Sequence, residues 1–72
     1  MKMAKFVEVE VFATFAEVYL MYGHSGPLLR QFHTEQHRKS FRKKAMKFAK
    51  RFAKKNGGLE VKKTDHTREM AT

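Results

Sequence analysis

Residues 41–55 read FRKKAMKFAKRFAKK, and this stretch decides the fold that we expect for the chain. At about 100° per residue, as in an α-helix, its apolar and basic side chains separate onto opposite sides. The apolar side consists of Phe41, Ala45, Phe48, Ala49 and Phe52. The basic side, nearly opposite, carries Lys39, Lys43, Lys47, Lys50 and Lys54. Such a helix covers an apolar surface of its own domain and turns its charge outward.

Both ends of this helix are marked in the sequence. Thr34 is the expected N-cap, because Glu35 and Gln36 follow it and place acceptor groups near the exposed amides of the first turn. The triplet Asn-Gly-Gly at residues 56–58 is expected to close the helix, since a glycine just past the last turn adopts the left-handed conformation.

The N-terminal segment predicts the surface that the helix covers. Residues 6–12 alternate strictly, with Val7, Val9 and Val11 on one face and glutamates on the other, as in a half-buried strand. Residues 13–22 also fit a helical stripe, but their Val, Tyr, Phe and Thr content favours a strand.

Two further strands follow from the turn signals. The cluster Gly-His-Ser-Gly-Pro at residues 23–27 predicts a sharp reversal, after which residues 28–33 return along the preceding strand as a hairpin. The alternative is a helix that begins at Ser25 with Pro27 in its first turn. Residues 59–63 alternate again and predict a third strand beside the N-terminal one.

These segments predict an α+β fold with the element order β-β-α-β. We expect one antiparallel or mixed sheet with a single long amphipathic basic helix packed on one face. Residues 1–63 are expected to form one compact domain, and residues 64–72, which lack an apolar period, a flexible C-terminal tail. A chain of this size buries only roughly 60% of the surface that it exposes when unfolded, so it has room for one small core.

No membrane or export segment is expected. Residues 11–22 are the most apolar part of the chain, but they are far shorter than a bilayer span and Glu17 lies among them. The chain has no cysteine, which excludes disulfides and thiolate metal sites. We therefore expect an intracellular, cytoplasmic protein.

The positive charge of the chain lies in and next to the expected helix. Residues 30–55 contain eleven lysines and arginines and one acidic residue, Glu35, so this segment carries +10 while the whole chain carries +9. Solvation of a small protein is the ordinary explanation for a basic helix, but this charge density exceeds what solubility requires. A polyanion is the natural partner for such a surface.

We therefore expect non-catalytic binding of DNA or RNA, directed at the phosphate backbone and weakly sequence-specific. The residues expected along the backbone are Lys39, Arg42, Lys43, Lys47, Lys50, Arg51 and Lys54.

A second hypothesis is a small protein–protein interaction module, such as a virus-encoded inhibitor or adaptor of a nucleic-acid-handling enzyme. Its partner would be an acidic or nucleic-acid-associated protein, or a second copy of the chain in a homodimer. The apolar anchors expected for this interface are Phe12, Tyr19, Tyr22 and Phe32. The basic helix also resembles one that lies on an anionic membrane surface, but its apolar side cannot insert into lipid and cover the valines at the same time.

The sequence predicts neither catalysis nor a cofactor. His33 and His37 have a helical spacing, but no third ligand lies at a useful distance along the chain, so no metal site is expected. The Gly-His-Ser-Gly segment lacks the scaffold of a nucleophile elbow and is interpreted as a turn. Glu8 and Glu10 share a strand face rather than a cleft, which is unsuited to general acid–base chemistry.

Overall fold

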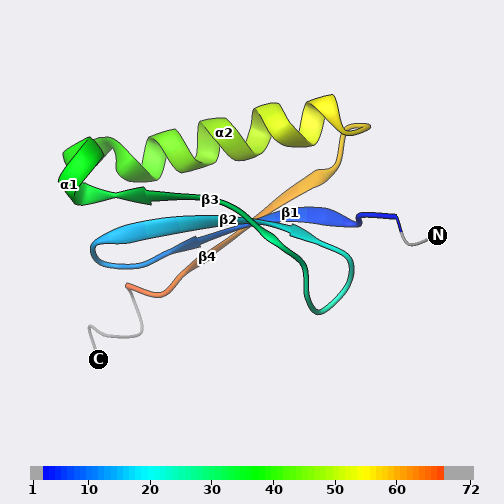
Figure 1. Ribbon diagram of the computed structural model, residues 1–72, viewed down its shortest axis with the longest axis horizontal. Helices are drawn as coiled ribbons and strands as arrows, with labels where there is room; N and C mark the ends of the chain where they lie inside the picture. Colours follow the sequence, from blue (N-terminus) through cyan, green and yellow to red (C-terminus); the bar gives the residue numbers. More distant parts are fainter. Residues whose placement is uncertain (1–2, 68–72) are drawn as a thin grey trace.

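The computed structural model describes residues 3–67 and has one helical layer above one sheet (Figure 1). Its elements are β1 (Phe6–Val11), β2 (Phe15–Met21), β3 (Leu28–His33), α1 (Thr34–His37), the short 3-10 helix η1 (Arg38–Ser40), α2 (Phe41–Lys55) and β4 (Glu60–Asp65). The strand order is β3-β2-β1-β4, with β1, β2 and β3 antiparallel in turn and β4 parallel to β1. The α+β fold with a mixed sheet is therefore confirmed.

The sheet contains one strand more than the expected order β-β-α-β. The run of residues 6–22 divides into β1 and β2, and the amide of Phe12 donates a hydrogen bond of 2.8 Å to the carbonyl of Phe15 across the turn. Neither Ala13 nor Thr14 is a typical turn residue, so the amino-acid composition does not predict this reversal. Its one trace is a change of parity, because the buried positions are odd up to Val11 and even from Ala16 onward.

The predicted reversal at residues 23–27 is confirmed as the β2–β3 connection. The amide of Tyr22 donates to the carbonyl of Ser25 at 2.9 Å, and the amide of Leu20 donates to the carbonyl of Pro27 at 3.0 Å. Gly26 passes so close to β2 that a Cβ atom at this position would overlap the carbonyl oxygen of Leu20. Only glycine fits here without a shift of the backbone.

The helical segment covers residues 34–55, but it is not one uniform α-helix. Arg38 has a positive φ of 51°, and η1 separates α1 from α2 at this point. The prediction of Thr34 as N-cap is wrong, because His33 occupies that position without a side-chain cap. The amide of Thr34 instead donates to the carbonyl of Thr14 at 3.0 Å, so the β1–β2 turn satisfies it.

The C-terminal end of α2 has the predicted glycine closure. Gly57 and Gly58 have φ values of 90° and 73°, in the region that favours glycine. The amide of Gly58 donates to the carbonyl of Ala53 at 2.9 Å, which satisfies one of the free carbonyls at the helix end. The chain then turns back into β4.

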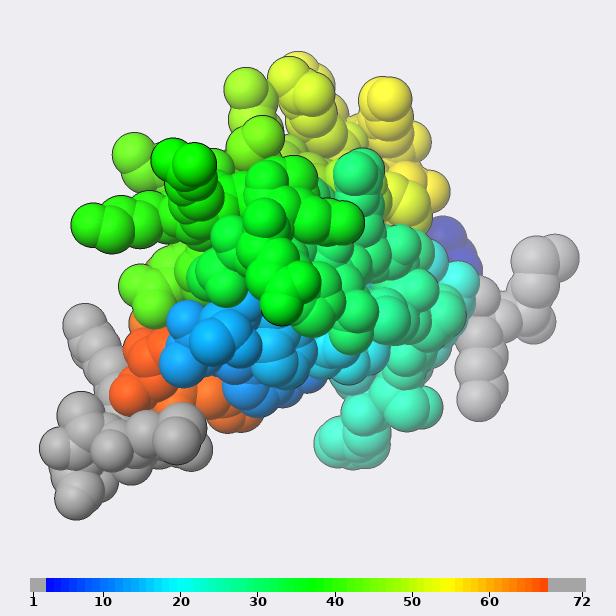
Figure 2. Space-filling model, turned by 60° about the vertical axis from the view of Figure 1, so that its left-hand side comes forward, coloured from blue at the N-terminus to red at the C-terminus, as the bar shows by residue number. Residues whose placement is uncertain are grey.

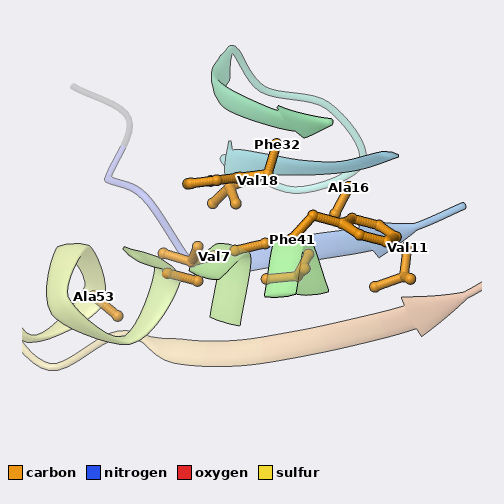
Figure 3. Close-up of a cluster of buried hydrophobic side chains, with 10 residues drawn as sticks. Val7, Val11, Ala16, Val18, Phe32, Phe41 and Ala53 are labelled. Carbon is orange, nitrogen blue, oxygen red and sulfur yellow. The ribbon is translucent and has the colours of Figure 1, made fainter. Parts of the chain in front are cut away.

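The core lies between the sheet and α2, as Figure 3 shows. Val7, Val9 and Val11 of β1 are fully buried, and so are Ala16 and Val18 of β2. From above, α2 contributes a buried row at intervals of four residues, Phe41, Ala45, Ala49 and Ala53. Small alanine side chains allow the helix backbone to approach the sheet closely. Both predicted apolar faces are therefore confirmed.

β4 lies beside β1, where the third expected strand was placed, and continues to Asp65. His66 remains in contact with the sheet, because its amide donates to the carbonyl of Val11 at 2.8 Å. The structured region thus extends beyond residue 63, and the rest of the expected tail, residues 68–72, lies outside the described residues. In the described part of the chain, no helix combines the length and the apolar composition of a bilayer span.

We expect Gly26→Ala to destabilise the fold by about 2 kcal/mol or more, because the backbone must move away from Leu20. For a domain of this size that loss lowers the melting temperature by about 8 °C or more, which thermal denaturation followed by circular dichroism measures. Ser25→Ala is the matched control in the same turn. Equal melting temperatures for the two variants would show that the close approach does not constrain the turn.

Candidate functional site

The outward side of α2 is a continuous basic surface. All the side chains predicted to lie along a polyanion are exposed on α2 and the adjoining η1: Lys39, Arg42, Lys43, Lys47, Lys50, Arg51 and Lys54. In the space-filling view of Figure 2, long side chains of this part of the chain, coloured green to yellow, project separately from the upper surface. The structure thus brings together the residues that the periodicity singled out.

These basic side chains have no carboxylate partner among residues 3–67. The one ion-pair contact within that range joins Nε2 of His66 to Oε1 of Glu10 at 2.9 Å, and it lies on the opposite face of the sheet. No acidic residue occurs in α2 itself. The charge of the helix is therefore left for solvent ions or for an external anion.

A first groove runs along the side of α2 that faces β4. Its volume is roughly 380 Å³, and it is lined by Arg42, Lys43, Met46, Lys47, Lys50 and Lys63. Lys63 comes from β4, where it pairs in register with Val9 and therefore points to the helix side of the sheet. Sequence reasoning missed Lys63, although the alternation that turns Val61 inward places Lys63 on the same face.

Asp65 is the acidic residue on β4 nearest to this groove. Hydrogen bonds from the side chain and the backbone amide of Thr67 lower its pKa, and the nearby charges of Lys63 and Arg42 act weakly in the same direction. Thr67 thus engages Oδ1 of Asp65, and no ion pair joins Asp65 to the described lysines and arginines. Asp65 therefore lies beside the groove without an ion pair to the lysines and arginines that line it.

A second groove lies on the other side of α2, toward β3. It has a volume of roughly 220 Å³ and is lined by Arg30, Phe32, His37, Lys44, Lys47, Phe48 and Arg51. The guanidinium carbon of Arg30 lies 5.1 Å from the ring centre of Phe32 and 5.7 Å from that of Phe48. Arg30, His37 and Lys44 were not among the predicted site residues. In the case of Arg30, only the pairing of β3 with β2 brings the side chain to this side of the sheet.

The face of the sheet turned away from α2 has a different character. Glu10 and Glu17 are direct cross-strand neighbours, and Glu8 lies beside them opposite Tyr19. At the end of this face near the β1–β2 turn, four rings stack in a row, with centres 4.5 Å apart for His66 and Phe12, 4.6 Å for Phe12 and Phe15, and 5.5 Å for Phe15 and His33. The open face is therefore acidic and aromatic, whereas the helix face is basic.

The four predicted protein-interface residues are divided by the fold. Phe12 and Tyr19 are half-buried on the open sheet face, and Tyr22, which directly follows β2, is 38% exposed. Phe32 is only 4% exposed and belongs to the core under α2. It cannot anchor a partner at the surface together with the other three.

The two histidines with helical spacing lie in different surroundings. His33 stacks on Phe15 on the open face, with Nε2 3.3 Å from Oε1 of Gln31, whereas the ring of His37 lies 5.6 Å from that of Phe32 in the second groove. Within residues 3–67, no three His, Asp or Glu side chains come together as a metal-binding group.

Tyr19 is the titratable residue most altered by the open face. Its hydroxyl donates a hydrogen bond of 2.7 Å to Oε1 of Glu17, and Gln31 donates to the other oxygen of the same carboxylate at 2.6 Å. The pKa of Tyr19 is raised from 10.0 to about 12, and this hydrogen bond is the largest cause. Partial burial and the negative charges of Glu17, Glu10 and Glu8 add to the effect.

We compared the chain with protein-family models, curated proteins and solved structures, and none of them matched. The geometry of the two grooves and of the open face therefore carries the functional argument.

We predict that tyrosinate absorbance of a Tyr22→Phe variant, whose one remaining tyrosine is Tyr19, titrates near pH 12. Glu17→Gln in that background should move the midpoint toward 10.0, because the acceptor loses its charge. Because the pKa of Tyr19 is raised by folding, its contribution to stability is complete below pH 10.0 and is lost as the pH rises to about 12. Identical midpoints with and without the Glu17 carboxylate would contradict the assigned hydrogen bond.

Proposed function

We propose that this protein binds nucleic acid without catalysis, through contacts between the basic side of α2 and the phosphate backbone. The observation that carries the proposal is the pair of grooves that flank α2. Lysine and arginine side chains of α2 line both grooves, joined by Lys63 of β4 in the first and Arg30 of β3 in the second, and no carboxylate of residues 3–67 lines either of them. A surface of one sign that is also concave concentrates its field on an anionic ligand.

The arrangement favours backbone contacts over base-edge contacts. Lysine binds phosphate as a mobile point charge, and each phosphate that it neutralises releases a condensed counterion. Such contacts fix the position of the protein on the nucleic acid, but they carry no sequence information. The proposed binding is therefore weakly sequence-specific and strongly dependent on salt.

The buried side of α2 supports this use of the helix. Phe41, Ala45, Ala49 and Ala53 are covered by the sheet, and Phe48 and Phe52 pack partly against the same core. Most of the apolar side of α2 is thus occupied within the domain, and its basic side is the one presented to a phosphate backbone. Insertion of this apolar side into a lipid surface would require the core to open.

We predict a slope of about −4 to −5 for the logarithm of the association constant against the logarithm of salt concentration, which corresponds to about five phosphate contacts. Lys43→Glu with Lys47→Glu should weaken binding at low salt on the order of tenfold or more and flatten the slope. Fluorescence anisotropy with labelled DNA and RNA measures both quantities.

The matched control is Lys5→Glu with Lys62→Glu, which changes the net charge equally but outside α2 and outside both grooves. Lys62 extends over the ring of Phe6, with Nζ 4.2 Å from the ring centre, on the open face of the sheet. We expect this control to keep most of the affinity. Equal losses in the two double variants would mean that net charge alone, and not the α2 surface, attracts the nucleic acid.

The open face of the sheet supports a second candidate function, the docking of a cationic protein. Like charges directly opposite each other on neighbouring strands destabilise a sheet, and Glu10 and Glu17 are such a pair. Basic side chains of a partner would relieve this repulsion, and the stacked rings of Phe12 and Phe15 offer apolar contact area beside them. Because this face lies opposite α2, the two candidate functions use separate surfaces (Figure 1).

A further inference from the structure

We propose that the groove between α2 and β3 receives an unpaired nucleobase, so that the protein prefers single-stranded nucleic acid to a duplex. This inference rests on the proposed function and deepens it. The groove combines aromatic rings, a planar cation and mobile cations in one small hollow. A nucleotide, which is a flat aromatic base joined to a phosphate, has the complementary chemistry.

The aromatic part of the hollow consists of two phenylalanines from different elements. Phe32 of β3 and Phe48 of α2 have ring centres 5.8 Å apart and are tilted by 59°. Phe32 is almost completely buried, whereas Phe48 is only partly covered, so Phe48 provides the accessible ring. An accessible ring inside a basic surface provides the stacking contact that sequence-tolerant single-strand binding uses.

Arg30 provides a second planar group in the same hollow. Its guanidinium lies over the rings of both Phe32 and Phe48. Within residues 3–67, no carboxylate forms an ion pair with it and no side-chain hydrogen bond engages it. Guanidinium planes stack on bases in RNA-binding proteins, and the N–H groups of Arg30 remain free for a base edge or a phosphate.

Cations around the hollow would hold the phosphates next to the bound base. Lys44, Lys47 and Arg51 project from successive turns of α2, and His37 of α1 also lines the hollow. Lys47 lines both grooves. A strand that places one base in the hollow can therefore continue across α2 at Lys47 and reach Lys43, Lys50 and Lys63 in the first groove.

The size of the hollow and the cost of extruding a base both favour a single strand. A volume of roughly 220 Å³ is below the range of about 300–1,000 Å³ typical of drug-sized ligands, and it suits one ring system. A base in a duplex has both faces stacked, and its removal costs unpairing and unstacking energy. A base in a single strand avoids most of this cost.

The test compares three variants on two main probes at several salt concentrations, with an abasic strand as a third probe for the wild type. The probes are a labelled oligothymidine and a duplex of equal length, and binding is followed by fluorescence anisotropy. Phe48→Leu removes the accessible ring and keeps an apolar side chain. Phe52→Leu is the matched control, because Phe52 stacks on Phe48 at 6.2 Å and packs on the same core, but lines neither groove. Arg30→Lys keeps the positive charge but removes the planar guanidinium group.

We expect the wild-type chain to bind oligothymidine more tightly than the duplex. Phe48→Leu should lose fivefold or more of the single-strand affinity, in line with about 1–3 kcal/mol per stacked base, with unchanged duplex affinity and salt slope. Arg30→Lys should lose part of the preference, and Phe52→Leu should retain it. An abasic strand of the same length removes the bases without altering the protein, and it should bind the wild type no better than the duplex does.

Two outcomes would overturn the inference. One is equal affinity of the wild type for oligothymidine, the abasic strand and the duplex. The other is equal effects of Phe48→Leu and Phe52→Leu in variants whose melting curves show that they fold. Both are distinct from failure of the proposed function, in which no probe binds or the reversals of Lys43 and Lys47 leave all binding unchanged.

Discussion

The structure depends on the burial of one apolar sheet face by one helix. β1 and β2 present valines and an alanine that are fully buried, and α2 is the element that covers them. At about 25 cal/mol per Å² of apolar surface, this contact is the main stabilising term available to so small a domain. Because one side of α2 is committed to the core, its other side must face outward, and that side is where the sequence places its lysines. Fold and surface charge are thus set by the same fifteen residues.

The commitment of α2 to the core also separates charge across the molecule. The outer layer is basic, while Glu8, Glu10 and Glu17 lie on the far side of the sheet. A polyanion approaching this dipolar arrangement is attracted by one face and repelled by the other, which orients the encounter. The grooves beside α2 enlarge the basic surface, since they add Arg30 of β3 and Lys63 of β4 to the lysines and arginines of the helix.

Periodicity predicted the parts of the structure that a single element determines. Strict alternation in β1 identified Val7, Val9 and Val11, and the helical period identified both sides of α2. The same reasoning failed where a reversal had no glycine or proline, at Ala13 and Thr14, because two strands joined by such a turn resemble one continuous pattern.

Features that require two elements were not accessible from the sequence. Arg30 and Phe48 meet only because β3 pairs with β2 in a register that turns Arg30 toward the sheet face covered by α2. Lys63 lines the first groove only because β4 lies parallel to β1. Phe32 illustrates the same limit, since an aromatic residue on an edge strand looks like a surface anchor until the helix that buries it is placed.

The composition of α2 has an energetic consequence that connects its stability with its ligand. Like charges three or four residues apart on a helix destabilise it by roughly 0.2–0.5 kcal/mol per pair, and Lys43, Lys47, Lys50 and Lys54 form a chain of such pairs without an acidic residue between them. Packing against the sheet offsets this repulsion in the folded domain. A bound polyanion would relieve the same repulsion, so the free energy that the charged side costs in the free protein returns as affinity for phosphate. A helix designed for stability alone would alternate its charges, and the absence of any acidic residue in α2 therefore favours a role in binding over one in solubility.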